Sequence, residues 1–176
     1  MQHEGILDRV GERARLTYTR ALNHTPDKVW RALTEADQLA AWFPDGAPVG
    51  EFVAGAPLKF GVNENGPSFT GSVVTVEPPR VLELLWGGDT LRFELRPDGD
   101  GTVLTFTDTF DEYGKAARDG AGWHACVENL VHALDGTPPP ADGVAHWRGL
   151  YAEYQEYLGP DASTSGIPAG HAVGES

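Results

Sequence analysis

One carboxylate stands out because it falls on the apolar side of a predicted strand. Side chains alternate between residues 102 and 110, so that Asp108 shares a face with Leu104 and Phe106. A carboxylate among apolar side chains is costly unless it is hydrogen-bonded, and burial raises its pKa. Asp108 is therefore a candidate polar anchor for a ligand hydroxyl or amine, or a candidate general acid or base. The alternative is a half-solvated residue at a strand end that accepts hydrogen bonds from the following loop.

A second polar group lies on the segment with the strongest helical pattern. His124, Glu128 and His132 recur every four residues, which places them on one helical face. The spacing differs from the His-Glu-x-x-His zinc motif because the glutamate lies midway between the histidines. We interpret the group as a solvated polar face and expect no metal site. Cys126 flanks the apolar stripe of this helix and is expected to be a buried small side chain, not a nucleophile.

The elements that must position Asp108 follow each other in an informative order. Residues 16–21 alternate as a strand, and two short helices follow within residues 25–44. Thr25 before Pro26 is the usual order of an N-cap followed by the first helical residue. Further strands are predicted at residues 51–54, 58–62, 68–76, 81–86, 90–96 and 102–110, and further helices at residues 122–134 and 147–158.

These elements divide the chain into one folded domain with flanking segments. The 176 residues are typical of a single domain. Glycine, alanine and serine dominate the last residues, a composition typical of disorder. We predict an N-terminal arm or short helix over residues 1–14, a domain over 15–136, a proline-rich linker over 137–145, a C-terminal helix over 146–158 and a disordered tail over 159–176.

Composition restricts the partners of this domain. A formal net charge of −13 disfavours nucleic acid, whose non-specific affinity comes from lysine and arginine on phosphates. No apolar run approaches the roughly 20 residues that a membrane-spanning helix needs, so we expect no membrane insertion. The single cysteine excludes internal disulfides and favours a cytoplasmic location. No glycine-rich nucleotide-binding pattern occurs, and we expect no cofactor.

Several segments carry a resemblance to a known family. They are PDKVWRALTEADQLAAWF (Pro26–Phe43), GSVVTVEPPRVLELLW (Gly71–Trp86), DGTVLTFTDTF (Asp100–Phe110) and AGWHACVENLVHAL (Ala121–Leu134). In this order they resemble the family named after the activator of Hsp90 ATPase, within the START-like (SRPBCC) superfamily. The resemblance implies an α+β helix-grip fold. In that fold a curved antiparallel sheet of about seven strands wraps around a long C-terminal helix, and two short helices follow the first strand.

The same resemblance implies a hydrophobic cavity between the sheet and the long helix. The implied function is the binding of a small hydrophobic or amphipathic molecule. An enzyme of the cyclase, dehydratase or hydrolase type using Asp108, and a co-chaperone-like interaction domain, stay open as alternatives, as do a homodimer and a chaperone partner. The inward strand faces and the helix stripe supply the expected cavity wall: Trp42, Phe43, Phe60, Phe69, Val74, Trp86, Phe93, Phe106, Asp108, Trp123 and Val127.

Overall fold

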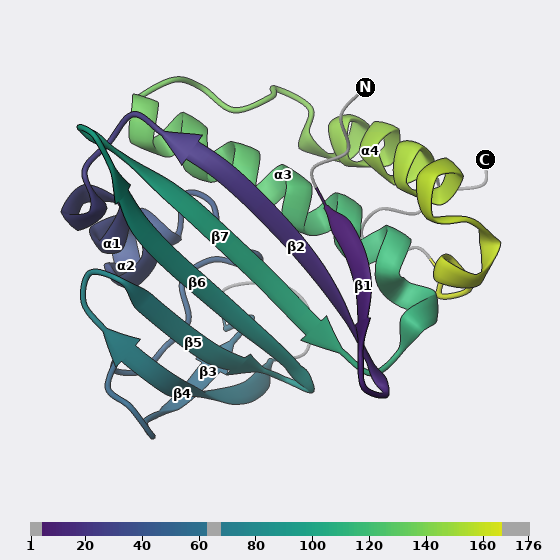
Figure 1. Cartoon of the computed structure of the whole chain (residues 1–176), viewed down its shortest axis with the longest axis horizontal. Helices are drawn as coiled ribbons and strands as arrows, with labels where there is room; N and C mark the ends of the chain where they lie inside the picture. Colours follow the sequence, from purple (N-terminus) through teal and green to yellow (C-terminus); the bar gives the residue numbers. More distant parts are fainter. Residues whose placement is uncertain (1–4, 63–67, 167–176) are drawn as a thin grey trace.

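A computed structural model describes residues 5–62 and 68–166. In this part of the chain seven strands form one antiparallel sheet: β1 (Ile6–Val10), β2 (Arg13–Leu22), β3 (Pro57–Phe60), β4 (Phe69–Glu77), β5 (Val81–Trp86), β6 (Asp89–Asp98) and β7 (Gly101–Phe110), in the spatial order β1-β2-β7-β6-β5-β4-β3. The helices are α1 (Pro26–Thr34), α2 (Ala36–Leu39), α3 (Ala116–Asp135) and α4 (Gly143–Leu158), with single turns η1 (Tyr113–Lys115) and η2 (Pro160–Ala162). Figure 1 shows α3 running across one face of the sheet and α4 lying against α3.

The central strand β7 determines which face of the sheet is buried. Every second residue of β7 is buried, and β7 pairs with β2 on one side and β6 on the other. In this register Asp108 lies opposite Leu16 on β2 and opposite Leu91 on β6, and all three side chains are buried. Alternation along β7 thus predicts the inward face, and Asp108 belongs to that face near the end of the strand.

The two short helices after β2 close one end of the sheet. Thr25 caps α1, since its side chain accepts a hydrogen bond from the backbone N–H of Lys28, and Pro26 occupies the first helical position. The turn that follows α2 buries Trp42, whose indole N–H donates to the carbonyl of Ala32 at 2.8 Å. The predicted helix pair is present, and its last aromatic residues belong to the core.

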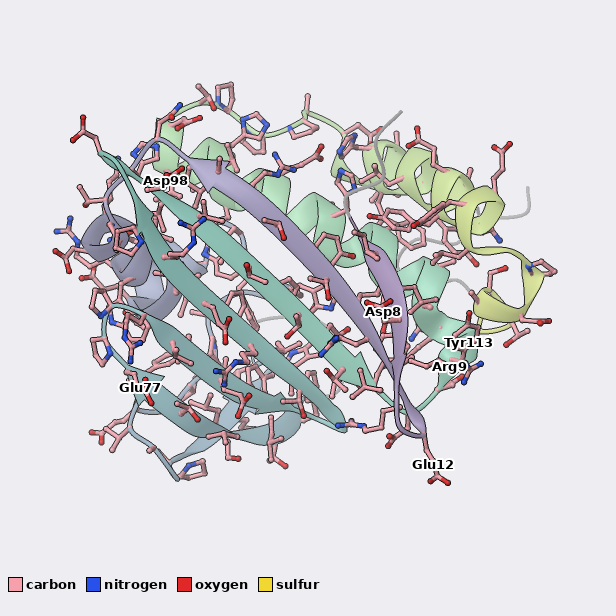
Figure 2. All side chains as sticks on the ribbon, in the orientation of Figure 1. Asp8, Arg9, Glu12, Glu77, Asp98 and Tyr113 are labelled. Carbon is pink, nitrogen blue, oxygen red and sulfur yellow. The ribbon has the colours of Figure 1, made fainter. Side chains whose placement is uncertain are left out.

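The N-terminal segment differs from the sequence prediction. Residues 6–10 form the edge strand β1 instead of an arm or short helix, and β1 pairs with β2 through a tight turn at Gly11, where φ is +63°. The guanidinium of Arg9 lies 4.2 Å from the ring centroid of Tyr113 (Figure 2).

The strand predicted over residues 51–54 is wrong, because Val53 is exposed and this segment forms turns. The predicted number of about seven strands is confirmed, although their membership differs.

The C-terminal elements are longer than predicted. Helix α3 begins at Ala116 instead of residue 122, because its first two turns bury small residues that give no strong apolar stripe. Asp142 caps α4, which begins at Gly143 within the predicted linker. Of the predicted disordered tail, Ala162 is buried, and the backbone N–H of Ser165 donates to the carbonyl of Gly114. Residues 167–176 of that tail lie outside the described residues. None of the described helices is long and apolar enough to span a membrane.

Small residues on α3 allow α4 to approach closely. A Cβ atom added at Gly120 would lie 2.9 Å from Cδ1 of Tyr154, a buried ring on α4. At Gly122 the nearest atom would be the indole nitrogen of Trp147 at 3.8 Å, an ordinary contact distance. The position of an added Cβ is therefore crowded at Gly120 and uncrowded at Gly122 of the same helix.

This difference predicts opposite effects of the same substitution. We expect Gly120→Ala to lower the free energy of unfolding by about 1–3 kcal/mol, because the buried ring cannot move away. Gly122→Ala should raise it by up to about 1 kcal/mol, the gain in helix propensity. Urea denaturation of both variants measures the two effects. Equal shifts in the same direction would contradict the packing described for Gly120.

Candidate functional site

Most of the predicted cavity wall packs against itself in the space between the sheet and α3. The ring centroids of Phe93 and Phe106 lie 4.6 Å apart, and those of Phe106 and Trp123 lie 4.9 Å apart. Trp42 contacts Phe93 edge to face, at 5.9 Å. These rings contact one another in the core between the sheet and α3. Of the predicted wall residues, the following are buried in the core: Trp42, Phe43, Phe60, Phe93, Phe106, Trp123 and Val127, with Phe69 and Trp86 partly buried beside them.

Val74 was wrongly predicted to face inward. Its side chain is 41% exposed, whereas that of Val73 is 1% exposed. The register of β4 against β5 shifts between Val73 and Thr75, so the bulge changes which residue faces the core. A run of two valines gives no sign in the sequence of which one turns inward.

A pocket of about 320 Å³ lies where α3, α4, the end of β5 and the loop after α2 meet. Three indole side chains, those of Trp86, Trp123 and Trp147, contribute to its wall. Of the predicted wall residues, Trp86 and Trp123 line this pocket. Its full lining in the described part of the chain is Pro44, Asp45, Trp86, Arg118, Asp119, Gly122, Trp123, Ala125, Cys126, Gly143 and Trp147.

The sequence analysis did not predict the pocket residues that lie on α4 and in the loop after α2. Trp147 was assigned to a separate C-terminal helix, and Asp45 follows the predicted helix pair, which was given as residues 25–44. Nothing in the local pattern indicates that α4 folds back onto α3. The small residues Ala117, Gly120 and Ala121 are a partial signal, because they permit close helix approach, and they pack against α4.

Asp108 lies beneath the pocket and holds one of its walls in place. The carboxyl is fully buried, and its Oδ2 accepts a hydrogen bond from the indole N–H of Trp123 at 3.0 Å. Its Oδ1 has no hydrogen-bond partner among the described residues. Burial raises the pKa of Asp108 well above its ordinary value of 3.8, and the nearby charges of Asp89 and Asp119 raise it further. Burial therefore favours the protonated, neutral form of this carboxyl.

Two further aspartates approach Asp108 but are held by cations. One carboxylate oxygen from each of Asp89, Asp108 and Asp119 lies within 4.8 Å of the others, a grouping that could supply metal ligands. The ammonium of Lys115 lies 2.5 Å from Asp89 and 3.1 Å from Asp119. The guanidinium of Arg118 lies 3.0 Å from Asp119. Because Asp89 and Asp119 both contact cationic side chains, we interpret the cluster as an ion-pair network and not as a metal centre.

The histidines of α3 do not form the predicted group. His124 is buried, and its Nδ1 lies 3.0 Å from the hydroxyl of Tyr154. Glu128 contacts His124 at 3.4 Å and His146 of α4 at 2.5 Å, whereas His132 pairs with Thr137. The prediction of a solvated face is wrong for His124, because α4 covers it. The cluster joins the two helices.

Cys126 lines the pocket as a thiol. Burial, with a smaller contribution from the charge of Asp45, raises its pKa to about 12. The thiolate that a nucleophile requires is therefore scarce at neutral pH. This agrees with the apolar role expected from the sequence.

The antiparallel seven-stranded sheet and the long helix across it define a helix-grip fold of the START-like class. Within that class, residues 23–135 match the family described as activator of Hsp90 ATPase homolog 1-like protein. The match covers more than half of the chain, which therefore belongs to this family. A search of curated proteins finds no match.

Solved structures share the fold at low sequence identity. A conserved protein of unknown function from Enterococcus faecalis superposes with a TM-score of 0.74 and 22% identity, covering 88% of this chain and 90% of that one. CalU16 from Micromonospora echinospora gives 0.69 and 19%, covering 88% and 97%. The Aha1 dimer from Colwellia psychrerythraea gives 0.59 and 22%, covering 68% and 95%. At these identities the likeness concerns the fold alone.

The raised pKa of Asp108 predicts a pH-dependent effect on stability. Above pH 3.8, the ordinary pKa of this group, the unfolded chain releases the proton while the folded protein keeps it. The folded state therefore loses stability as pH rises from about 4 toward neutral, at most about 1.4 kcal/mol per pH unit. Asp108→Asn keeps an acceptor for Trp123 and lacks this ionisation, so its stability relative to the wild type should increase over the same range.

Chemical denaturation of both proteins between pH 4 and pH 7 measures this difference. Asp8→Asn is the matched control, because Asp8 is exposed on β1 (Figure 2) and the same substitution there removes no buried carboxyl. A stability difference for Asp108→Asn that stays constant across this range would contradict a buried neutral acid.

Proposed function

We propose that this domain binds a small apolar or amphipathic molecule in the pocket between α3 and α4. The observation that carries the proposal is the convergence of Trp86, Trp123 and Trp147 on one hollow. Its volume, about 320 Å³, is within the range of small-molecule sites, about 300–1,000 Å³. Binding would come from burial of apolar ligand surface, at about 25 cal/mol per Å². The apolar ligands implied by the START-like resemblance support the same class.

The walls of this pocket are fixed before a ligand arrives. Trp123 is held by its hydrogen bond to Asp108 and by the ring of Phe106. The ring of Trp147 stacks on Tyr151, with centroids 5.0 Å apart. A pre-formed apolar site binds more tightly because fewer side chains must be ordered on binding. Asp108 then acts as a positioning residue that orients a wall of the site.

The burial of Asp108 and the position of the pocket also bear on the alternative functions. An acid or base role for Asp108 gains no support, because the carboxyl is fully buried and does not line the pocket. A homodimer is the second candidate, supported by the solved Aha1 dimer from Colwellia psychrerythraea, which has the same fold. We propose the cytoplasm as the location, since the single cysteine fits a reducing compartment.

Filling the pocket tests the binding proposal. Gly122 lines the pocket, and a Cβ there meets only Trp147 at 3.8 Å, so Gly122→Leu should fold and occupy the ligand space. We expect this variant to bind naphthylmethanol, a neutral aromatic probe, more than about tenfold more weakly than the wild type, as measured by isothermal titration calorimetry.

The control is the same substitution on the neighbouring helix. Gly149 of α4 is exposed, and a Cβ there meets no atom within 4 Å. Gly149→Leu should bind the probe like the wild type. Unchanged binding by Gly122→Leu would overturn the assignment of the ligand to this pocket, and so would the absence of binding by the wild type.

A further inference from the structure

The structure assigns a charge preference to this pocket: we infer that it selects organic cations with a planar apolar body, such as an aromatic or quaternary amine. The inference rests on the proposed function and adds the chemical class of the ligand. It is carried by a single uncompensated carboxylate, that of Asp45, at the edge of a wall made of indoles.

The charges around the pocket leave one carboxylate without a partner. Arg118 and Asp119 line the pocket together, but Arg118 is paired with Asp119, which Lys115 also contacts. Lys115 in turn pairs with Asp89, so these four side chains are neutral as a group. Asp45 has no ion pair among the described residues. A ligand in the pocket therefore meets one net negative charge.

Asp45 is held at the pocket edge by the turn that follows α2. Its φ is +60°, a left-handed conformation that aspartate and asparagine adopt more readily than most other residues. The adjacent Pro44 also lines the pocket. Asp45 is exposed to solvent and lines the same pocket as Cys126. Its negative charge is a secondary cause, after burial, of the raised pKa of that thiol, which agrees with its place at the pocket edge.

The indoles supply the second half of a cation site. Tryptophan is the side chain whose ring face attracts cations most strongly. The rings of Trp86 and Trp123 lie edge to face with centroids 5.2 Å apart, so they present differently oriented surfaces to one ligand. An ammonium over an indole and beside Asp45, with its apolar body against Trp147, would use both the charged edge and the aromatic wall of the pocket. The net charge of −13 adds a field that attracts cations and repels anions.

Three probes with the same ring system separate charge from shape. They are naphthylmethyl-trimethylammonium, neutral naphthylmethanol and anionic naphthylacetate, each titrated by calorimetry at low salt. We expect the cation to bind at least about tenfold more tightly than the anion, with the neutral probe between them. Equal or tighter binding of the anion would overturn the inference. Binding of naphthylmethanol without any charge preference would leave the proposed function intact, so the two failures are distinguishable.

Removing the charge of Asp45 locates the preference. Asparagine tolerates the same left-handed backbone, so Asp45→Asn changes charge with little strain. We expect it to weaken binding of the cation about three- to fivefold and to leave naphthylmethanol unchanged. Asp37→Asn is the control, because Asp37 is exposed on α2, lies outside the pocket and alters net charge equally. Equal effects of the two variants would show a general field instead of a site, and would overturn the role of Asp45.

Discussion

The hydrogen bond from Trp123 to Asp108 joins α3 to strand β7 beside the buried ring of Phe106. It satisfies a buried indole N–H that would otherwise cost about 1–3 kcal/mol. Because burial raises the pKa of Asp108 and so favours its neutral form, the cost of placing a carboxyl in this interface is reduced. The same bond fixes the indole that forms the floor of the pocket, so fold stability and site geometry depend on one pair of residues.

A second constraint is the close approach of α4 to α3. Tyr154 packs on Gly120, and its hydroxyl accepts a hydrogen bond from the backbone N–H of Gly5 and contacts His124. The hydroxyl of Tyr18 donates to the carbonyl of Gly120. These contacts tie the two helices to the start of the chain and to β2. Because they hold α4 against α3, these contacts also place Trp147, a residue of α4, in the wall of the pocket.

The net charge around the pocket depends on two cationic side chains. Lys115 precedes α3 and Arg118 lies in its first turn, and both pair with the carboxylates that approach Asp108. These ion pairs compensate the negative charges of Asp89 and Asp119. The carboxylate of Asp45, at the edge of the pocket, has no ion pair among the described residues. A protein with net charge −13 therefore has a nearly neutral apolar pocket with one negative group.

The sequence by itself determined the sheet, the helix pair and the inward direction of Asp108, because alternation, capping and helical periodicity are local properties. It also indicated the family, through segments that occur in the right order. It did not predict β1, the early start of α3 or the outward turn of Val74, since an edge strand, a run of small residues and a bulge carry weak patterns. The tertiary structure alone decided that the predicted wall packs into a core. It alone decided that the pocket forms at α4, because a cavity depends on how distant elements fill space, and residue types do not specify that.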